Sequence, residues 1–423
     1  MDKKAWVIAV DMGYGHQRTA YPLRHLAFEG KVINANNYEG IPKRDKEIWQ
    51  KAKNGYEFIS AFRRTPVIGP LVFGAFNKLQ RILSFYPKRD LSEPNFQLRQ
   101  TLAPIQKGWG RDLIETLRLR SGREPLPLIA TFFTAVFMAE YFKYPGEIYC
   151  VVCDTDISRT WAPLRPQKSK IKYFTPTARV AERLQLYGVR PENIFLTGYP
   201  LPQENIGSEK TEILKEDLKH RLVNLDPRGR YFKNYQDLIE LKLGKLPKKS
   251  NHPLTVMFAV GGAGAQREIG VKIVNHLAKK IKSGQVKVIL VAGVREKIRN
   301  YFRGKTRGLD IEIIFDENIT NYFQKFNQAL RKTDILWTKP SELSFYSALG
   351  LPIVIAPPIG SQEEFNQRWL LNSGFGILQK DVNYLEQWLF DWLDQGYLAE
   401  CAMQGFVEGE KLGTFNIQKI CFG

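Results

Sequence analysis

The chain has 423 residues, which is long for one hydrophobic core and favours two domains of roughly 200 residues each. Hydrophobic residues make up 43% of the sequence and charged residues 25%, a composition that is typical of globular proteins and argues against disorder. The 62 lysines and arginines exceed the 43 acidic residues and give a formal net charge of +19, which favours an anionic partner. Because no zinc-finger, homeodomain-like or RNA-recognition signature is present, an anionic membrane or an acidic substrate is favoured over nucleic acid.

Two further classes are excluded by segment length and cysteine usage. The longest nearly apolar runs, residues 126–139 and 66–76, are shorter than the roughly 20 residues that span a bilayer. The first apolar run is too short for a signal peptide, so we expect a cytoplasmic protein. Four cysteines do not make a disulfide framework. Cys150 and Cys153 lie three residues apart in a predicted strand, and since they point to opposite faces we expect burial rather than a shared metal.

The chain begins with a predicted strand over residues 5–10, followed by Gly13, Gly15 and His16 and a helix from Gln17. A strand, a glycine turn and a helix form the first unit of a Rossmann-like domain. The dinucleotide fingerprint requires Gly or Ala where this chain has Arg18. We therefore expect no nicotinamide or flavin cofactor.

A basic and apolar stretch follows a second strand within residues 31–38 and a helix over 45–64. The apolar run 66–76 is flanked by cations, and such a segment suits an interfacial helix on an anionic membrane. A core helix with a solvated charged rim is an equal alternative. The cations are Arg63, Arg64, Arg81, Lys88 and Arg89.

Further strands are predicted at residues 126–130, 147–153, 172–174 and 193–196, with helices at 134–142 and 178–187, and they complete a doubly wound domain over residues 1–200. Asp154 and Asp156 directly follow one of these strands. Two carboxylates in this spacing suit magnesium or manganese. Alternatively Asp154 orients or deprotonates an acceptor hydroxyl, or caps a loop. We favour the acceptor role and predict no metal.

The second half repeats the pattern. Residues 201–252 are highly charged and predict a helix and a linker between domains. Strands at 254–260, 286–292, 311–315, 335–337 and 353–356 predict a second doubly wound domain over 253–400, before a helical tail at 401–423. The first of these strands ends in Gly261, Gly262 and Gly264. Glycines at a helix N-terminus expose N–H groups that suit a diphosphate, although a structural turn has the same pattern.

The segment 338–376 is the most informative. It predicts a turn at Lys339, a helix capped by Ser341 and ending at Leu349, a buried strand, and a helix beginning near Gln362. In open α/β sheets, ligands bind beyond the carboxyl ends of strands and at helix N-termini. We therefore expect a crevice lined by Ser341, Glu342, Gln362 and Glu363.

This segment, the Gly13–His16 loop and residues 188–200 together resemble glycosyltransferases of the GT-B fold. The similar families are monogalactosyldiacylglycerol synthases, processive diacylglycerol glucosyltransferases and the lipid-linked N-acetylglucosaminyl transferase of peptidoglycan synthesis. The resemblance implies an α/β fold of two doubly wound Rossmann-like domains facing across a cleft, without a required metal.

The resemblance also assigns roles. Lys339 opens the donor site, and Gln362, Glu363 and Asn366 meet the sugar of a uridine diphosphate donor. Ser347 stands where the families carry a glutamate for the ribose, so Glu342 is the candidate replacement. His16 lies between acceptor and donor as a candidate general base, the alternative being a helix cap. Asp154 is the second candidate for that role.

The predicted function is transfer of a hexose from a UDP-sugar to a membrane lipid such as diacylglycerol, with inversion and without a cofactor. The enzyme is expected at the inner face of the membrane as a peripheral protein. The alternatives are a non-hydrolysing epimerase of a UDP-amino sugar and a non-catalytic relative that binds nucleotide sugar or docks on membrane.

Overall fold

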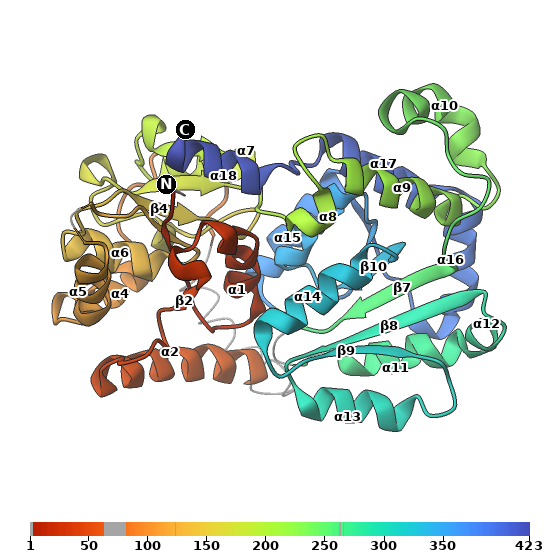
Figure 1. The fold of residues 1–423 in the computed structure, drawn as a ribbon, viewed down its shortest axis with the longest axis horizontal. Helices are drawn as coiled ribbons and strands as arrows, with labels where there is room; N and C mark the ends of the chain where they lie inside the picture. The colour runs from red at the N-terminus through yellow and green to blue at the C-terminus, as the bar shows by residue number, and fades with distance from the viewer. Residues whose placement is uncertain (1–2, 63–81, 123, 262–263, 265) are drawn as a thin grey trace. The chain divides into compact units, whose positions relative to one another are not determined.

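The computed structural model describes residues 3–62, 82–122, 124–261, 264 and 266–423. The chain divides into two compact units. The first unit comprises Met1–Pro200, Ile359–Phe365 and Leu412–Gly423, and the second comprises Leu201–Pro358 and Asn366–Lys411. Each is described by itself below (Figure 1).

The first unit is built on a six-stranded parallel sheet with strand order β2-β1-β3-β4-β5-β6. Successive parallel strands need a crossover connection, which is why helices alternate with them. The register places Trp6 opposite Leu128 and Tyr149 opposite Lys172. The strands are β1 (Trp6–Ala9), β2 (Ile33–Asn34), β3 (Leu128–Ala130), β4 (Ile148–Val151), β5 (Lys172–Thr175) and β6 (Ile194–Leu196).

Helices cover this sheet. The α-helices are α1 (Tyr14–Ala20), α2 (Lys43–Phe62), α4 (Phe96–Gln106), α5 (Arg111–Arg120), α6 (Phe133–Tyr141), α7 (Ala178–Leu186) and α18 (Gly413–Phe422). The 3-10 helices are η1 (Tyr21–Leu26), η2 (Phe28–Gly30), η3 (Arg159–Trp161), η4 (Pro166–Lys168) and η5 (Pro191–Asn193). One prediction is corrected in its described part: residues 82–90 are not helical, so neither an interfacial nor a core helix extends through them. The run 66–76 lies outside the described residues.

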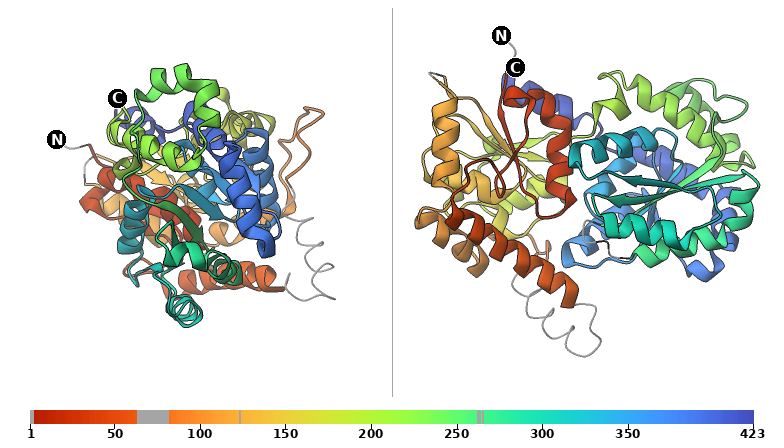
Figure 2. Two further views of the ribbon diagram at one scale, coloured as in Figure 1. Left: turned by 90° about the vertical axis from the view of Figure 1, so that its right-hand side faces the viewer. Right: turned by 60° about the horizontal axis from the view of Figure 1, so that its bottom comes forward.

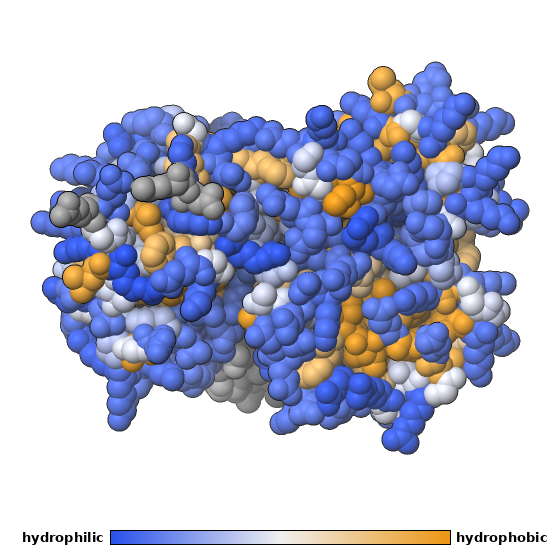
Figure 3. Space-filling view, in the orientation of Figure 1, coloured by the Kyte–Doolittle hydropathy of each residue, from blue (hydrophilic) through white to orange (hydrophobic). Residues whose placement is uncertain are grey.

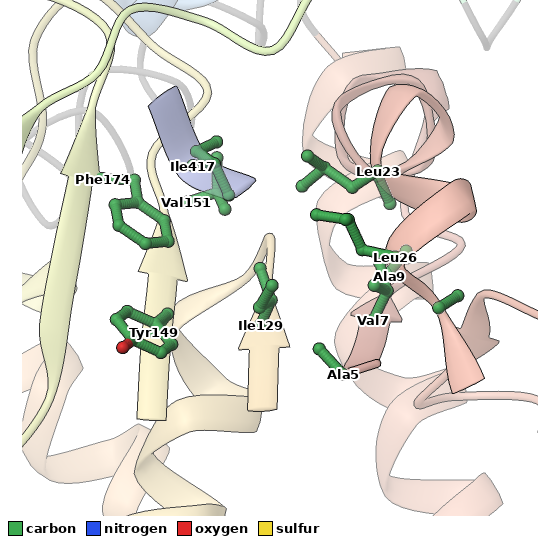
Figure 4. Packing of buried hydrophobic residues seen from close by; sticks show 12 residues of the cluster. Ala5, Val7, Ala9, Leu23, Leu26, Ile129, Tyr149, Val151, Phe174 and Ile417 are labelled. Carbon is green, nitrogen blue, oxygen red and sulfur yellow. The ribbon is translucent and has the colours of Figure 1, made fainter. Parts of the chain in front are cut away.

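Residues of β1 form part of the hydrophobic core of the first unit. Ala5, Val7 and Ala9 alternate along the strand, so all three point to one face of the sheet. They pack with side chains of neighbouring strands, of η1 and of the C-terminal helix α18, where Ile417 is fully buried (Figure 4). Helix α18 lies beside η1, as Figure 2 also shows. The last helix of the chain thus completes the core begun by the first strand.

The second unit has a six-stranded parallel sheet with strand order β12-β11-β10-β7-β8-β9. Counted within the unit, this is the Rossmann order, in which the third strand is at one edge and the sixth at the other. The strands are β7 (Leu254–Ala259), β8 (Val286–Gly293), β9 (Glu312–Phe315), β10 (Ile335–Thr338), β11 (Ile353–Ile355) and β12 (Gly376–Leu378). The two sheets confirm the predicted α/β class with two doubly wound Rossmann-like domains.

Helices flank both faces of the second sheet, with α13 and α14 on opposite sides of β8 and β9 (Figure 1). Where the sequence predicts one helix and a linker, the structure has three helices of the second unit. The helices are α8 (Gln203–Ile206), α9 (Glu212–Leu225), α10 (Arg230–Leu243), α11 (Arg267–His276), α12 (Ala278–Lys282), α13 (Glu296–Lys305), α14 (Ile319–Leu330), η6 (Glu342–Leu349), α15 (Ser361–Asn372), η7 (Val382–Tyr384), α16 (Leu385–Asp394) and α17 (Tyr397–Glu408).

The tryptophan-rich helix near the C-terminus, α16, belongs to the core of the second unit. Trp388 and Trp392 are buried, and the ring of Trp388 packs edge-on against Trp337 of β10 at 5.4 Å between centroids. Tyr384, which precedes the helix, is 60% exposed and lies outside this core. A fully buried large side chain stabilises by roughly 1.5–3 kcal/mol, so this stripe contributes to holding α16 on the sheet.

The surface agrees with the composition. Hydrophilic side chains predominate on the face drawn in Figure 3, and the apolar groups gather mainly at its lower right, where Figure 1 draws β8 and β9. Among the described residues, no helix is both long enough and apolar enough to cross a membrane.

Candidate active site

Both sheets have a topological switch point, where strand order reverses and a crevice opens beyond the carboxyl ends of two adjacent strands. In the first unit it lies between β1 and β3, and in the second between β7 and β10. The residues that follow these strands are Asp11–His16, Thr131–Thr134, Val260–Gly264 and Lys339–Glu342. Most candidates identified in the sequence are therefore at the positions that this fold uses for ligands.

The glycine loop after β1 is held by side chains. Gly13 has φ of 100°, a conformation that a residue with a Cβ rarely adopts. Asn36 accepts a hydrogen bond from the Asp11 N–H at 2.9 Å and donates one to the Asp11 carbonyl at 3.1 Å. The carbonyl of Gly15 accepts from the Thr19 hydroxyl at 2.8 Å. The loop therefore presents the next residue, His16, in a fixed position.

His16 is oriented by the loop after β3. Its Nδ1 lies 2.8 Å from the carbonyl oxygen of Thr131, and the Thr131 hydroxyl donates to the His16 carbonyl at 3.0 Å. Since a carbonyl only accepts, Nδ1 carries the proton in the neutral ring and Nε2 carries the lone pair. The ring of Phe132 packs edge-on against the imidazole at 4.7 Å. This is the tautomer that a general base acting through Nε2 requires.

His16 and Asp154 line one cavity of about 470 Å³ in the first unit. Aromatic side chains supply much of its wall, and aliphatic side chains, amides, hydroxyls and Lys51 supply other parts of it. Asp154 reaches it because it follows β4, two strands from β1 in the sheet. Gln362, at the start of α15 and grouped with the first unit, also lines it. The aromatic lining residues are Trp49, Phe96, Trp109, Phe132, Phe133 and Trp161.

The second carboxylate of the D-x-D pair is engaged elsewhere. Asp156 accepts two hydrogen bonds from the guanidinium of Arg183, at 2.8 and 2.7 Å, and Arg183 is fully buried. Asp156 also accepts from the N–H of Ile157. This bidentate pair leaves Asp154 as the carboxylate that faces the cavity. Among the described residues, no cluster of three or more His, Cys, Asp or Glu is arranged to hold a metal.

Cys150 and Cys153 are both buried, the first in β4 and the second just after it. Burial raises the pKa of the Cys150 thiol well above its ordinary value, so it stays protonated and unreactive. Cys153 Sγ lies 3.5 Å from His16 Nδ1. We found no sign in the sequence of this contact.

At the switch point of the second unit, the glycine loop and Lys339 lie against each other. A Cβ added to Gly261 would approach Lys339 Cε to 2.5 Å and its Nζ to 3.3 Å. The ammonium group therefore lies beside the backbone of the loop that precedes α11. Gly264 has φ of 68°, its N–H donates to the Gly261 carbonyl at 2.7 Å, and a Cβ there would strike Ile298 at 2.6 Å. Gly262 lies outside the described residues.

The other residues of the segment 338–376 that are predicted to bind the UDP-sugar differ from one another in their surroundings. Ser341 caps η6 by accepting from the Leu343 N–H at 3.4 Å, and Glu342 is partly exposed in its first turn. Asn366 is 1% exposed and donates to the Pro340 carbonyl at 3.4 Å. The Glu363 carboxylate accepts from the Ile359 N–H at 2.6 Å, so it also fixes the loop before its helix.

Ser347, which takes the position of the families' ribose-binding glutamate, is fully buried. Its hydroxyl donates to the Ser344 carbonyl at 2.8 Å. A buried and satisfied hydroxyl does not face a ligand, so this position is structural here.

The basic segment is described only in part. Arg63, Arg64 and Arg81 lie outside the described residues. Lys88 is exposed and pairs with Glu182 at 3.0 Å, and exposed Arg89 donates to the Pro87 carbonyl at 2.9 Å. Sequence reasoning did not identify Trp49 and Trp109. The one signal for Trp49 was that the neighbouring Ile48 and Ala52 recur on one face of α2, and Trp109, between α4 and α5, had none.

Three comparisons place these observations among known proteins. Residues 245–310 match a family described as a domain of unknown function, DUF6938. The chain is 21% identical over 257 residues to a processive diacylglycerol beta-glucosyltransferase of Bacillus subtilis (strain 168), covering 59% of this chain and 56% of the relative. The match thus spans little more than half of that relative's length.

A protein of the same description from Bacillus pumilus (strain SAFR-032) is 21% identical over 390 residues, which is 89% of this chain and 83% of the relative. Among solved structures, MurG of Acinetobacter baumannii aligns over 99% of both chains at 12% identity and a TM-score of 0.46. The UDP-GlcNAc 2-epimerase of Neisseria meningitidis bound to UDP-GlcNAc aligns over 83% of this chain and 86% of its own, at 13% identity and a TM-score of 0.45. The distant similarity to diacylglycerol glucosyltransferases that the motifs indicated is confirmed.

Proposed function

We propose that this protein is a glycosyltransferase that moves a hexose from a UDP-sugar to a lipid acceptor such as diacylglycerol, with inversion and without a metal. The observation that carries the proposal is the cavity of the first unit, where His16 and Asp154 meet an aromatic wall. A hydroxyl group attached to hydrocarbon fits that combination, because the wall accepts the apolar part and the two polar side chains engage the hydroxyl.

His16 is the proposed general base. The acceptor oxygen forms a bond to the anomeric carbon, the bond from that carbon to the diphosphate breaks, and the hydroxyl proton passes to Nε2 of His16. Thr131 favours this transfer because its carbonyl accepts from Nδ1–H and stabilises the imidazolium that forms. Asp154 is proposed to orient the hydroxyl. Attack opposite the leaving group inverts the configuration.

The second unit is the proposed donor-binding unit. Lys339 and the backbone of Gly261 and Gly264 are at the switch point of a Rossmann sheet, and together they would stabilise the negative charge of the departing diphosphate. Glu342 and Asn366 of this unit are proposed to orient the ribose and the sugar, and the sugar-binding roles of Gln362 and Glu363, which are grouped with the first unit, stay predictions. Glutamate at 342 is the remaining candidate for the ribose because Ser347 is buried.

The proposal is tested by incubating the protein with a panel of UDP-hexoses and a lipid extract, followed by mass spectrometry of new glycolipids. His16→Gln is expected to lower the rate by about 10²–10⁴-fold, the usual contribution of a general base. His25→Gln is the matched control, since His25 bonds Pro22 and Gln418 away from the cavity. Full turnover of His16→Gln would remove this role. Conversion of UDP-N-acetylglucosamine without any acceptor would favour the epimerase instead.

A further inference from the structure

Trp109 has an unusual place in the cavity of the first unit. Its side chain is 4% exposed and lines the cavity. Within the described part of the chain, its buried indole N–H has no hydrogen-bond acceptor. Buried polar groups in native proteins nearly always have a partner, so a group without one calls for an explanation.

Other buried tryptophans of this chain follow the rule. Trp6 donates to the Ser121 hydroxyl, Trp337 to the Gln379 amide oxygen and Trp388 to the Asp381 carbonyl, each at 2.9 Å. The fold is therefore able to satisfy an indole N–H where the group is only structural. Trp388 also lines a pocket, on the second unit, and its N–H is still satisfied, so Trp109 differs from these three in the lack of an acceptor for its N–H among the described residues.

The ring of Trp109 has little freedom to find another partner. It packs edge-on against Trp49 at 4.6 Å between centroids. Its own backbone N–H donates to the Pro104 carbonyl at 3.0 Å. The next residue, Gly110, has φ of 84°, donates to Asp45 at 2.9 Å, and packs so tightly that a Cβ would meet the sulfur of Met138 at 2.3 Å. The N–H is thus held in place before any ligand binds.

The neighbouring helix α4 adds further polar groups. Gln97, Gln100 and Thr101 are spaced i, i+3 and i+4, so they share one face of the helix, and all three line the cavity. The hydroxyl of Thr160 donates to the Gln97 amide oxygen at 3.0 Å. The amide N–H₂ of Gln97 keeps two donors beyond this bond. The indole of Trp109, the amides of Gln97 and Gln100 and the ammonium of Lys51 thus bring N–H donors to a cavity with a largely aromatic wall.

We propose that the cavity recognises an acyl ester, and that Trp109 donates its N–H to an ester carbonyl oxygen of the acceptor. An ester carbonyl accepts hydrogen bonds and donates none, which matches the N–H groups of Trp109 and Gln97. The acyl hydrocarbon next to it suits the aromatic wall. This inference rests on the proposed function, since it names the feature of the lipid acceptor that the same cavity selects. Trp109 is accordingly a specificity-determining residue.

The test compares two probes by equilibrium dialysis at concentrations below those at which they form micelles. The probes are radiolabelled 1,2-dioctanoylglycerol, which has ester carbonyls, and 1,2-di-O-octylglycerol, which has ether oxygens in their place. One additional hydrogen bond makes the wild-type protein bind the ester about 3- to 10-fold more tightly than the ether. Trp109→Phe removes the N–H and keeps an aromatic ring, and it is expected to abolish this preference.

Trp6→Phe is the matched control. It also removes a buried indole N–H from the first unit, but one that already has a partner. It is expected to lower the thermal midpoint of unfolding and to leave the ester preference unchanged. If Trp109→Phe does not fold, a benzothienylalanine at position 109 keeps the size of the ring and replaces the N–H by sulfur.

An ester preference that persists without the Trp109 N–H overturns the proposal. So does a wild-type protein that binds neither probe, or binds both equally. Because the dialysis contains no UDP-sugar, a failure to transfer sugar counts against the proposed function and leaves this result intact. Ester-selective binding without transfer would support the cavity assignment and remove the enzymatic one.

Discussion

Asp154 and Asp156 lie two residues apart, but their carboxylates have different surroundings. Asp154 lines the cavity, whereas Asp156 is buried and held by Arg183. Asp156→Asn leaves a buried guanidinium without its counter-charge, so we expect a loss of about 3–5 kcal/mol in the free energy of unfolding. Asp154→Asn is expected to leave stability within about 0.5 kcal/mol of the wild type and to lower transfer. Urea unfolding and the glycolipid assay measure the two effects.

The two variants serve as controls for each other. A stable Asp156→Asn protein that has lost activity would instead indicate that both carboxylates act on substrate or metal. Restored activity of either variant on addition of manganese would also indicate that the carboxylates act on a metal.

Gly261 gives a second prediction at this scale. A methyl group at this position displaces only the flexible end of Lys339, so Gly261→Ala is expected to cost little stability. If Lys339 binds diphosphate, the same change weakens UDP binding, by about 10-fold for a loss of roughly 1.4 kcal/mol. Isothermal titration with UDP measures it, and Gly304→Ala, in α13 where nothing lies near the added carbon, is the control. Equal UDP affinity in Gly261→Ala and wild type contradicts the role of Lys339.

The family resemblance named His16 and Asp154 as candidates for one role, and both line one cavity because both follow strands of one parallel sheet. Residue types and spacing did not predict that the indole N–H of Trp109 lacks an acceptor within the described residues or that Ser347 is buried. Whether an N–H finds a partner, and whether a hydroxyl faces solvent, depends on side chains far away in sequence. Thr131, which sets the tautomer of His16, is 115 residues from it.

At the scale of elements, Arg221 joins α9 to the sheet of the second unit. Its fully buried guanidinium donates to the carbonyls of Thr333, Leu349 and Gly350, at 2.8, 2.7 and 3.2 Å, and to Leu330 at 3.3 Å. These groups lie before β10 and β11, the strands that bracket η6 with Ser341 and Glu342. Burial lowers the pKa of Arg221, while the charge of Asp334 acts in the opposite sense.

Arg221→Met is therefore expected to lower the free energy of unfolding by about 3–5 kcal/mol, because it removes a buried group and leaves several carbonyls without donors. Arg221→Lys keeps the charge but not the planar fork, so it is expected to recover only part of the loss. Urea unfolding monitored by circular dichroism measures both. Arg228, whose partner Asp394 is exposed on the surface, supplies the control variant Arg228→Met, for which a change within about 1 kcal/mol is expected. If Arg221→Met is as stable as Arg228→Met, the hydrogen bonds of Arg221 do not hold α9 on the sheet.

The strands that were predicted from the sequence are buried and apolar, such as β7 and β8. Sequence reasoning missed β12, because three residues after Gly374 carry too short a pattern, and this edge strand is defined by pairing of Gly376 with Ile353. It also predicted one helix and a linker over residues 201–252, where the structure has three helices. Their charge concealed apolar positions such as Leu214, Leu218 and Leu222, which are buried.

For the whole molecule, the net charge of +19 predicts attraction to anionic lipid that weakens as salt screens it. We propose that the basic stretch ending at Arg89 contributes to it. Each cation near such a surface contributes about 1 kcal/mol, so Lys88→Glu with Arg89→Glu is expected to weaken vesicle binding by at least about 10-fold. Flotation with vesicles containing phosphatidylglycerol, at low and at physiological salt, measures the change.

The control must carry the same change in charge at other lysines. Lys287 and Lys325 of the second unit suit it, because they pair on the surface with Glu312 and Asp316 as Lys88 pairs with Glu182. Exposed pairs of this kind contribute at most about 1 kcal/mol to stability, so both double variants are expected to fold. Equal weakening of the two would show that total charge governs binding, because both lose the same four units. Undiminished flotation of the Lys88 and Arg89 variant would show that this stretch is not an anchor. Weaker flotation of this variant but not of the control would locate the lipid-facing surface on the first unit, whose cavity we assign to the lipid acceptor.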